Sequence, residues 1–580
     1  MELSGAWLAA SADEGLRRAY PAPEFDDRSW VPISVPGHWR SATSFGAHDG
    51  PLLYRHHFSA EPPAEGRRGW LTFDGIFYQG DVWLDGSYVG VTEGYFFPHV
   101  FEITGALRDR EEHVLGVEVT CTRPTDRTAK RNLTGVFQHW DCIDPDWNPG
   151  GIWRPVRVHE TGSVRIKHLR VLCTEATAER AVIEVRAVLD AAVAVPAVVR
   201  TTITSPSGAV VAETSDEHRL AAGENRFNFP VRVEQPQLWW PHALGDQPLH
   251  DLTLTVSTGG SAVPGEVSDE ATRHTGLRQV RMKRWIMTVN GERLFLKGTN
   301  QGPSRTALAE ATAEDLENDV LLAKRAGLDL LRVHGHISRS ELYEAADRHG
   351  LLLWQDLPLQ WGYARTVRKQ AIRQAREAVD LLGHHPSIAL WCAHNEPFAI
   401  DGEPTLVRLG ALQELPTWNK TFLDASIKRA LSRADRTRPV VPHSGVLPGP
   451  LSGGTDSHLY LGWYVGVERD FPRLLAAWPR LARFVTEFGA QAVPDNDEFV
   501  DADRWPDLDW ERLGRSHALQ RKEFDRYVPP GEHDSYKSWR AATQAYQAEV
   551  LRSHVETLRR LKYRPTGGFC QFSFADGSPA

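Results

Sequence analysis

The spacing of apolar residues along the chain changes near residue 285. Before that point, short segments alternate apolar and polar positions with a period of two, as in residues 71–77 and 113–121. The Asp85–Gly86 pair predicts a tight hairpin turn between two such strands. Similar segments continue over residues 163–275, beyond a seam near residues 162–165. This pattern predicts one or two antiparallel β-sandwiches.

After residue 285, strand-like and helix-like segments alternate. An Asn290–Gly291 turn precedes a buried strand, and residues 312–327 carry apolar positions at helical spacing. Thr312 is suited to cap that helix and Gly327 to end it. Eight strands are expected in all, at residues 288–298, 328–335, 351–356, 387–396, 439–445, 457–464, 481–489 and 567–576. Repeated alternation predicts a parallel sheet, and eight strands indicate a (β/α)8 barrel.

Two parts of the predicted barrel leave alternatives open. Residues 491–535 are charged and contain prolines, and form either a loop beside the barrel mouth or a mobile surface insertion. The eighth strand runs almost to Ala580, which leaves no room for an eighth helix. Either the barrel is completed unusually, or the chain stops before its natural end.

Composition narrows the choice of partners. A net charge of −9 and a pI near 6.3 favour a neutral or small polar substrate, and give no reason to expect nucleic acid or an anionic membrane surface. Neither an apolar signal-peptide core nor a membrane-length apolar run is visible. The cysteines show no zinc spacing or disulfide framework, so we expect a reducing, cytoplasmic location; they are Cys121, Cys142, Cys173, Cys392 and Cys570.

Two glutamates follow predicted barrel strands. Glu396 comes after the fourth strand, preceded by Asn395, and Glu487 ends the seventh. Active groups of such barrels lie where strands end, so both carboxylates should reach one rim. One glutamate at a strand end is more often structural or exposed, but a converging pair favours glycoside hydrolysis. A gap of about 5 Å would imply retention and a wider gap inversion, and the sequence leaves both open.

Longer motifs resemble glycoside hydrolase family 2, which contains β-galactosidases, β-glucuronidases and β-mannosidases. The similar stretches are IALWCAHNEP (388–397) and FVTEFG (484–489), with LSGAW (3–7), NPGGIWRPV (148–156), LWWPHALGDQPL (238–249), TGLRQV (275–280) and NGERLFLKGTN (290–300). The resemblance covers nearly the whole chain. It implies a jelly-roll β-sandwich over residues 1–160, an immunoglobulin-like β-sandwich over 161–282 and a catalytic (β/α)8 TIM barrel over 283–580.

The same resemblance implies roles for individual residues. Glu396 would be the acid/base and Glu487 the nucleophile of a retaining double displacement. Asn395 would hydrogen-bond the substrate 2-hydroxyl, and Tyr460 would support the nucleophile. The remaining predicted substrate-binding residues are His334, His458, Trp354, Asp356 and Trp391, although Trp354 alone could be a core residue.

The sequence also departs from the family pattern. Phe572 stands where relatives usually carry the tryptophan of the eighth-strand motif that runs from Gly568 to Asp576. After the second strand, either His334 or His336 could face the sugar, or both could be structural. A first-domain loop would supply an acidic residue, for which the candidates are Asp141, Asp144 and Asp146. The family's usual C-terminal β domains are missing from the sequence.

These observations predict an exo-acting β-glycosidase of a small glycoside or oligosaccharide. The sugar stays open between β-mannoside, β-galactoside and β-glucuronide. We expect no cofactor and no required metal, because no compact carboxylate cluster is visible. A homo-oligomer is possible by analogy with relatives. The alternatives are a carbohydrate-binding protein without turnover and a transglycosylase that uses the same carboxylates.

Overall fold

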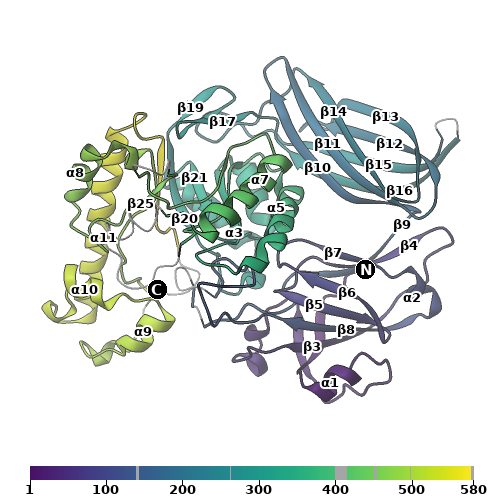
Figure 1. The fold of residues 1–580 in the computed structure, drawn as a ribbon, viewed down its shortest axis with the longest axis horizontal. Coiled ribbons are helices and arrows are strands. Elements are labelled where there is room, and N and C mark those ends of the chain that lie inside the picture. Colours follow the sequence, from purple (N-terminus) through teal and green to yellow (C-terminus); the bar gives the residue numbers. More distant parts are fainter. Residues whose placement is uncertain are drawn as a thin grey trace.

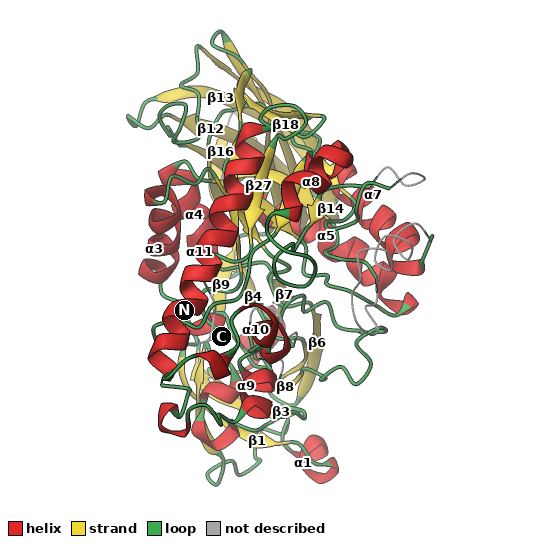
Figure 2. Cartoon of the chain, turned by 90° about the vertical axis from the view of Figure 1, so that its left-hand side faces the viewer, coloured by secondary structure: helices red, strands yellow, loops and turns green. Residues whose placement is uncertain are grey.

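A computed structural model describes residues 1–138, 143–144, 146–260, 263–398, 415–449, 454–496 and 498–575. The barrel lies at the centre of Figure 1, with one β-sandwich above it and another below it on the right. Both views agree on this vertical order (Figures 1 and 2). The predicted class of fold, two β-sandwiches followed by a barrel, is therefore confirmed.

The first sandwich packs a six-stranded sheet against a three-stranded one. Its predicted hairpin is present, since Asp85 and Gly86 both have the left-handed φ values, 51° and 81°, that such a turn needs. The strands are β1 (Gly5–Ser11), β2 (Val31–Val35), β3 (Leu52–Ser59), β4 (Arg68–Phe73), β5 (Gln79–Leu84), β6 (Ser87–Glu93), β7 (His99–Glu102), β8 (Glu112–Thr120) and β9 (Val156–Thr161), with helices α1 (Glu14–Ala19) and α2 (Thr104–Asp109).

In the second sandwich, a three-stranded sheet packs against a four-stranded sheet. The paired strands in both sheets are antiparallel. Alternate residues of its long strands are buried between the sheets, as period two requires. Its strands are β10 (Val164–Ala176), β11 (Arg180–Ala191), β12 (Val195–Thr204), β13 (Val210–Leu220), β14 (Gly223–Glu234), β15 (His250–Gly260) and β16 (Val263–Thr275).

A small antiparallel sheet precedes the barrel, formed by β17 (Val280–Lys283), β18 (Ile286–Val289) and β19 (Glu292–Leu294). The Asn290–Gly291 turn joins the last two of these strands, as predicted. The barrel strands follow as β20 (Leu296–Gln301), β21 (Leu330–Val333), β22 (Leu352–Asp356), β23 (Ile388–Cys392), β24 (Val440–Val441), β25 (Ser457–His458), β26 (Phe484–Glu487) and β27 (Gly568–Gln571).

These eight strands form one parallel sheet in the order β24-β23-β22-β21-β20-β27-β26-β25. The last strand, β27, pairs with both β26 and β20, so the last barrel strand is hydrogen-bonded to the first. The fifth and sixth predicted strands contribute only two residues each to the sheet.

Helices cover the outside of the barrel. Thr312 caps α3 in a reciprocal capping box with Asp315, as predicted, and Gly327 follows the helix with a left-handed φ of 72°. The helices are α3 (Ala313–Arg325), α4 (Ser340–His349), α5 (Arg368–Leu382), α7 (Asp424–Ala434), α8 (Asp470–Ala477), α9 (Trp510–Ser516), α10 (Arg521–Tyr527) and α11 (Tyr536–Arg560). The long α11 crosses the face turned to the viewer in Figure 2.

Residues 491–535 contain α9 and α10 and have a hydrophobic cluster of their own. Leu513 and Phe524 are buried there against Trp539 of α11 and Trp463, which follows β25. Gln520 accepts a 2.7 Å hydrogen bond from the Trp463 indole and donates to the Tyr464 hydroxyl. Of the two alternatives, this packing favours the position beside the barrel mouth over a mobile surface insertion, although the segment contains two helices where a loop was expected.

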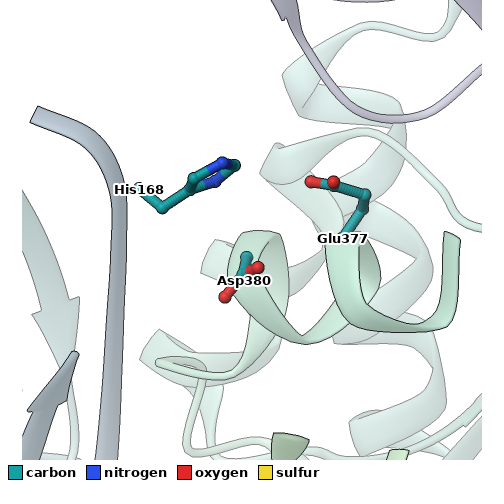
Figure 3. Close-up of side chains that lie close together, drawn as sticks. All are labelled: His168, Glu377 and Asp380. Carbon is teal, nitrogen blue, oxygen red and sulfur yellow. The ribbon is translucent and has the colours of Figure 1, made fainter. Parts of the chain in front are cut away.

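The second sandwich meets the barrel along β10 and α5. Arg170 of β10 forms a 2.5 Å ion pair with Asp380 of α5. Beside this pair, the imidazole of His168 faces the carboxylate of Glu377, one helical turn before Asp380 (Figure 3). Charged groups therefore lie in the contact between the two domains. No helix in the described ranges is long and apolar enough to cross a membrane.

Candidate active site

Both predicted catalytic carboxylates lie at the carboxyl edge of the barrel sheet. Glu487 is the last residue of β26, and Glu396 lies in the loop that follows β23. Their side chains are 7% and 17% exposed, so both are mostly shielded from water. Glu396 has a left-handed φ of 44°, a conformation that a non-glycine residue adopts only when its surroundings hold it.

One histidine joins the two carboxylates. Nδ1 of His458 lies 2.8 Å from Oε1 of Glu396 and 3.2 Å from Oε2 of Glu487. All three ligand-capable atoms of this group lie within 4.8 Å of one another. The folded chain thus brings together two glutamates that are far apart in the sequence, and it places a predicted substrate-binding residue between them.

The hydrogen-bonding pattern indicates that His458 carries a positive charge. Its Nδ1 meets carboxylate oxygens, which only accept. Its Nε2 lies 3.2 Å from the hydroxyl of Ser444, whose proton goes to Asp456 at 2.6 Å. Both ring nitrogens must therefore donate. Burial opposes this charge, but the nearby Glu487 and Glu396 carboxylates outweigh it and raise the pKa of His458.

The two glutamates have opposite pKa shifts. Burial raises the pKa of Glu487, and the positive charges of His458 and Arg332 offset only part of that effect. Burial also acts on Glu396, but the hydrogen bond and charge of His458, with a further bond from Trp361, lower its pKa overall. As the side chains stand, Glu396 is the stronger acid of the pair.

Arg332 is the residue that our sequence analysis missed. It is fully buried in β21 and lies 2.9 Å from Glu487, 2.8 Å from Asp356 and 3.0 Å from Asn300. It also donates to the side-chain oxygen of Asn395. An arginine among the apolar residues of segment 330–333 was the available signal, because arginine is rarely buried without carboxylate partners.

Three further predicted residues lie in this network. The hydroxyl of Tyr460 donates to Oε2 of Glu487 at 3.0 Å. The amide of Asn395 donates to Gln360 at 2.9 Å. Asp356 accepts from Arg332 and from the indole of Trp354 at 2.9 Å. Asp356 is completely buried, so its contacts support the floor of the site.

Trp354 lies below that floor. It is 1% exposed and stacks on Trp285, with ring centroids 6.1 Å apart. Trp354 therefore lies in the core, which was the alternative to a substrate-binding role in the sequence analysis.

The two histidines after β21 have different surroundings. Nδ1 of His334 lies 3.9 Å from Oε1 of Glu487, and its ring packs edge-on against Phe572 at 5.4 Å. The ring of His336 instead packs against Phe137 of the first sandwich, and its Nδ1 lies 3.0 Å from the His334 carbonyl oxygen. Of the two, only His334 lies beside one of the predicted catalytic carboxylates. Phe572 is therefore adjacent to the site.

Trp391 does not join the site, and its predicted substrate-binding role needs correction. Its indole donates to Asp435 at the end of α7 at 2.9 Å. Its neighbours Leu390 and Cys392 pack inside the barrel, whereas Trp391 packs with the surrounding helices. Successive residues of a strand point to opposite faces, so Trp391 faces outward.

The structure describes two of the three first-domain acidic candidates, Asp144 and Asp146. Asp146 pairs with Arg123 and lies 3.8 Å from Arg515 of α9. Asp144 accepts a 2.8 Å hydrogen bond from the Asp146 backbone, and burial raises its pKa. Asp141 lies outside the described residues, as does Asp576. Neither Asp144 nor Asp146 has a contact with Glu396 or Glu487.

Trp361 is a second residue that the sequence did not reveal. It lies in the loop after β22, and its indole donates to Oε2 of Glu396 at 3.0 Å. No residue pattern marked it, because its place depends on a loop whose φ at Trp361 is 59°.

The site also contains atoms that metals prefer. Glu396, His458 and Glu487 each offer a ligand atom within the 4.8 Å group, and metal binding there would require His458 to lose its Nδ1 proton. In the part of the chain that the structure describes, the other such group is His168, Glu377 and Asp380. That no metal is required stays a prediction.

The fold and this site define a class of protein: a barrel with a paired-carboxylate site, preceded by two β-sandwiches. Two family models match it. Residues 46–154 match the galactose-binding domain-like model of glycosyl hydrolase 2, and residues 164–278 match glycosyl hydrolases family 2. These two matches lie in the sandwiches, and together with the relatives below they support glycoside hydrolase family 2.

Individual relatives agree with this assignment. The chain is 28% identical to β-mannosidase B of Thermothelomyces thermophilus, over 89% of this chain and 65% of that protein. Its structure is similar to a β-D-mannosidase from Dictyoglomus thermophilum, with a TM-score of 0.79, 21% identity, and coverage of 100% of this chain and 74% of the other.

A second solved structure is that of Bacteroides uniformis β-glucuronidase 2, with a TM-score of 0.76, 20% identity, and coverage of 100% and 65%. The chain spans 65% of the length of the Thermothelomyces relative and 58% of the length of the β-mannosidase B of Aspergillus oryzae.

Proposed function

We propose that this protein is a retaining exo-β-glycosidase that removes a terminal β-linked sugar, with β-mannoside as the favoured substrate. The observation that carries the proposal is the convergence of Glu396 and Glu487 on one histidine, with carboxylate oxygens within 4.8 Å. Retaining enzymes need a carboxyl separation of about 5–5.5 Å, whereas inverting enzymes need about 6.5–9.5 Å to admit a water. The short separation supports retention.

In the proposed first step, Glu487 attacks the anomeric carbon while Glu396 gives its proton to the glycosidic oxygen. The bond to the leaving group breaks and a glycosyl–Glu487 ester forms. In the second step, Glu396 takes a proton from water, the water oxygen bonds to the anomeric carbon, and the ester bond breaks. Arg332 and Tyr460 stay hydrogen-bonded to Glu487 and stabilise its carboxylate when it leaves.

The pKa shifts place a condition on this mechanism. An acid catalyst must be protonated, yet His458 lowers the pKa of Glu396. Burial is the largest influence on that carboxyl, and it raises the pKa. We therefore propose that a sugar bound between the carboxylates breaks the Glu396–His458 contact, so that burial then raises the pKa of Glu396 and lets it hold a proton.

The preference for β-mannoside rests on two observations. The sequence LLLWQD (351–356) resembles the β-mannosidase form of the family, and the first relatives above are β-mannosidases. A β-glucuronidase also shares the fold, so a glucuronide or galactoside remains the second candidate. Asn395 is the proposed partner of the sugar 2-hydroxyl, the group whose configuration distinguishes mannose from glucose.

The test is turnover of aryl β-mannoside, β-galactoside, β-glucuronide and β-glucoside by the unchanged chain and by Glu487→Gln. We expect fastest release of phenol from the β-mannoside and none from the variant. Proton NMR of the first-formed sugar should show the β-anomer. Exposed Glu344 of α4 provides the control, because Glu344→Gln should keep full activity.

Each result has a definite consequence. First formation of the α-anomer would rule out retention. Turnover of another glycoside in place of mannoside would correct the sugar and keep the carboxylate assignment. A folded protein that binds sugars but turns over none of the panel would favour the carbohydrate-binding alternative.

A further inference from the structure

The first sandwich reaches into the barrel through the connection between β8 and β9. Lys130 of that connection forms a parallel bridge with Tyr363, in the loop after β22. The Ala364 N–H donates to the Lys130 carbonyl oxygen at 2.9 Å. A Cβ on Gly362 would lie 2.3 Å from the Thr128 carbonyl oxygen, so the two backbones approach closely only because residue 362 is a glycine.

The side chain of Lys130 strengthens this contact. It is 7% exposed, and its Nζ donates to the backbone carbonyl of Gln360 at 2.6 Å. The same ammonium lies 4.5 Å from the centroid of the Tyr363 ring, a cation–π contact. Hydrogen bonds from charged donors are roughly twice as strong as neutral ones, so this residue holds the loop strongly.

The loop that Lys130 holds touches both Asn395 and Glu396. The side-chain oxygen of Gln360 accepts from Asn395, and the Trp361 N–H donates to the Asn395 carbonyl at 3.1 Å. The Trp361 indole reaches Oε2 of Glu396 at 3.0 Å. Lys130 is thus connected to the proposed acid/base through two consecutive residues, Gln360 and Trp361.

The backbone conformations of this connection depend on contacts with neighbouring residues. Trp361 and Glu396 have left-handed φ values of 59° and 44°. Such conformations are strained and persist only where neighbouring contacts impose them. One of these contacts is the 2.7 Å bond between His394 Nε2 and the Trp361 carbonyl oxygen. The bond from Lys130 to Gln360 is another, and it comes from a different domain.

We propose that Lys130 is a positioning residue: through Gln360 and Trp361 it holds Glu396 in place, so the first sandwich completes the acid/base of the barrel. This inference rests on the proposed function and adds a requirement to it. The barrel alone contains Glu396 and Trp361, but the cation that holds their loop comes from outside the barrel.

Leaving-group dependence tests this role. Acid assistance speeds the cleavage of aryl β-mannosides whose phenol is a poor leaving group. It has little effect on 2,4-dinitrophenyl β-mannoside, because dinitrophenolate leaves without taking up a proton. Because general acids contribute about 10²–10⁴-fold, Lys130→Met should lower kcat/KM at least ~10-fold for the phenyl glycoside and less than ~3-fold for the dinitrophenyl one. Lys130→Arg, which keeps a cationic donor, should recover most of the loss.

Two further variants separate positioning from a general effect on folding. Lys297 also donates its Nζ to a backbone carbonyl at 2.6 Å, that of Gly327, but at the start of β20, away from the site. Lys297→Met should leave the ratio of the two rates unchanged. Trp361→Phe removes the bond to Glu396 and should reproduce the Lys130→Met ratio. In the Trp361→Phe background, Lys130→Met should change the ratio of the two rates only a little further, because both substitutions act on Glu396 through the same contacts.

The outcomes divide clearly. An equal loss on both glycosides, or a full additional loss in the Trp361→Phe background, would overturn the inference while the proposed function stands. If Lys130→Met does not fold, a Trp361→Phe variant with an unchanged ratio would still overturn it. Failure of the unchanged protein to turn over any glycoside of the panel would overturn the proposed function and this inference together.

Discussion

Arg332 sets the charge balance at the scale of single residues. It brings one positive charge between Glu487 and Asp356, and His458 brings a second between Glu487 and Glu396. Buried carboxylates are costly unless paired, and the two cations allow several to share one shielded site. The arrangement explains why the sequence carries an arginine inside a barrel strand.

The role of His458 predicts a shift of the pH profile. Its positive charge lowers the pKa of both Glu396 and Glu487, so His458→Gln should raise both values. The nucleophile must be ionised and the acid protonated, so both limbs of the kcat/KM profile should move to higher pH. Arg332 and Tyr460 also face Glu487 and stay in place.

The measurement is kcat/KM for an aryl β-mannoside across the pH range. His349→Gln provides the control, since His349 pairs with Glu317 on the surface of α4 and α3 and should not shift the profile. An acid limb that stays in place in His458→Gln would show that His458 does not act on Glu487.

At the scale of elements, most of the correct predictions of strands, turns and helix ends came from patterns among residues close in sequence. Period two gave the sandwich strands, and the Thr312 cap and the Asp85–Gly86 turn lie where the sequence predicts them. For Trp391, whose predicted role came from the family resemblance, this rule was not applied. Strand alternation from its neighbours Leu390 and Cys392 already places it outside the barrel.

The cap of α3 predicts a purely structural effect. In Thr312→Ala, the Asp315 N–H loses its 3.1 Å acceptor, and stability should fall by about 1 kcal/mol. Urea unfolding measures this loss. Because α3 lies outside the barrel sheet, kcat/KM of the folded variant should be unchanged; a fall in kcat/KM would tie α3 to the site.

At the scale of the whole molecule, the domains are joined by polar contacts. Glu377 of α5 lies in the contact with the second sandwich, where burial and then the charge of Asp380 raise its pKa to about 7. The positive charges that oppose this shift, and the histidine beside it, are Arg373, Arg170, Lys167 and His168. The side chain is shown in Figure 3.

This contact predicts a stability that falls with pH. Glu377 is protonated in both states below about pH 4.5, so it carries no penalty there. As the pH rises to about 7, only the unfolded chain ionises, and stability is lost until the folded pKa is passed. Glu377→Gln should therefore be more stable than the unchanged chain at pH 8, by about 1–3 kcal/mol, and nearly equal at pH 4.5.

Thermal unfolding at the two pH values measures the difference. The exposed Glu344→Gln should change stability by less than ~0.5 kcal/mol at either pH. Equal effects of Glu377→Gln at both pH values would show that the carboxyl titrates normally.

By itself the sequence determined the order of domains, the eight barrel strands, and the two glutamates with Asn395 and Tyr460. The strands and the rim positions of the glutamates depend on periodicity, turn residues and strand ends, which are properties of neighbours in the chain, whereas Asn395 and Tyr460 were predicted from the resemblance to family motifs. Only the tertiary structure placed His458 between Glu396 and Glu487, Arg332 beneath them, and Lys130 of another domain against the loop that carries Trp361. Such contacts join residues far apart in sequence, and their distances are set by how strands close and domains dock, which no local pattern records.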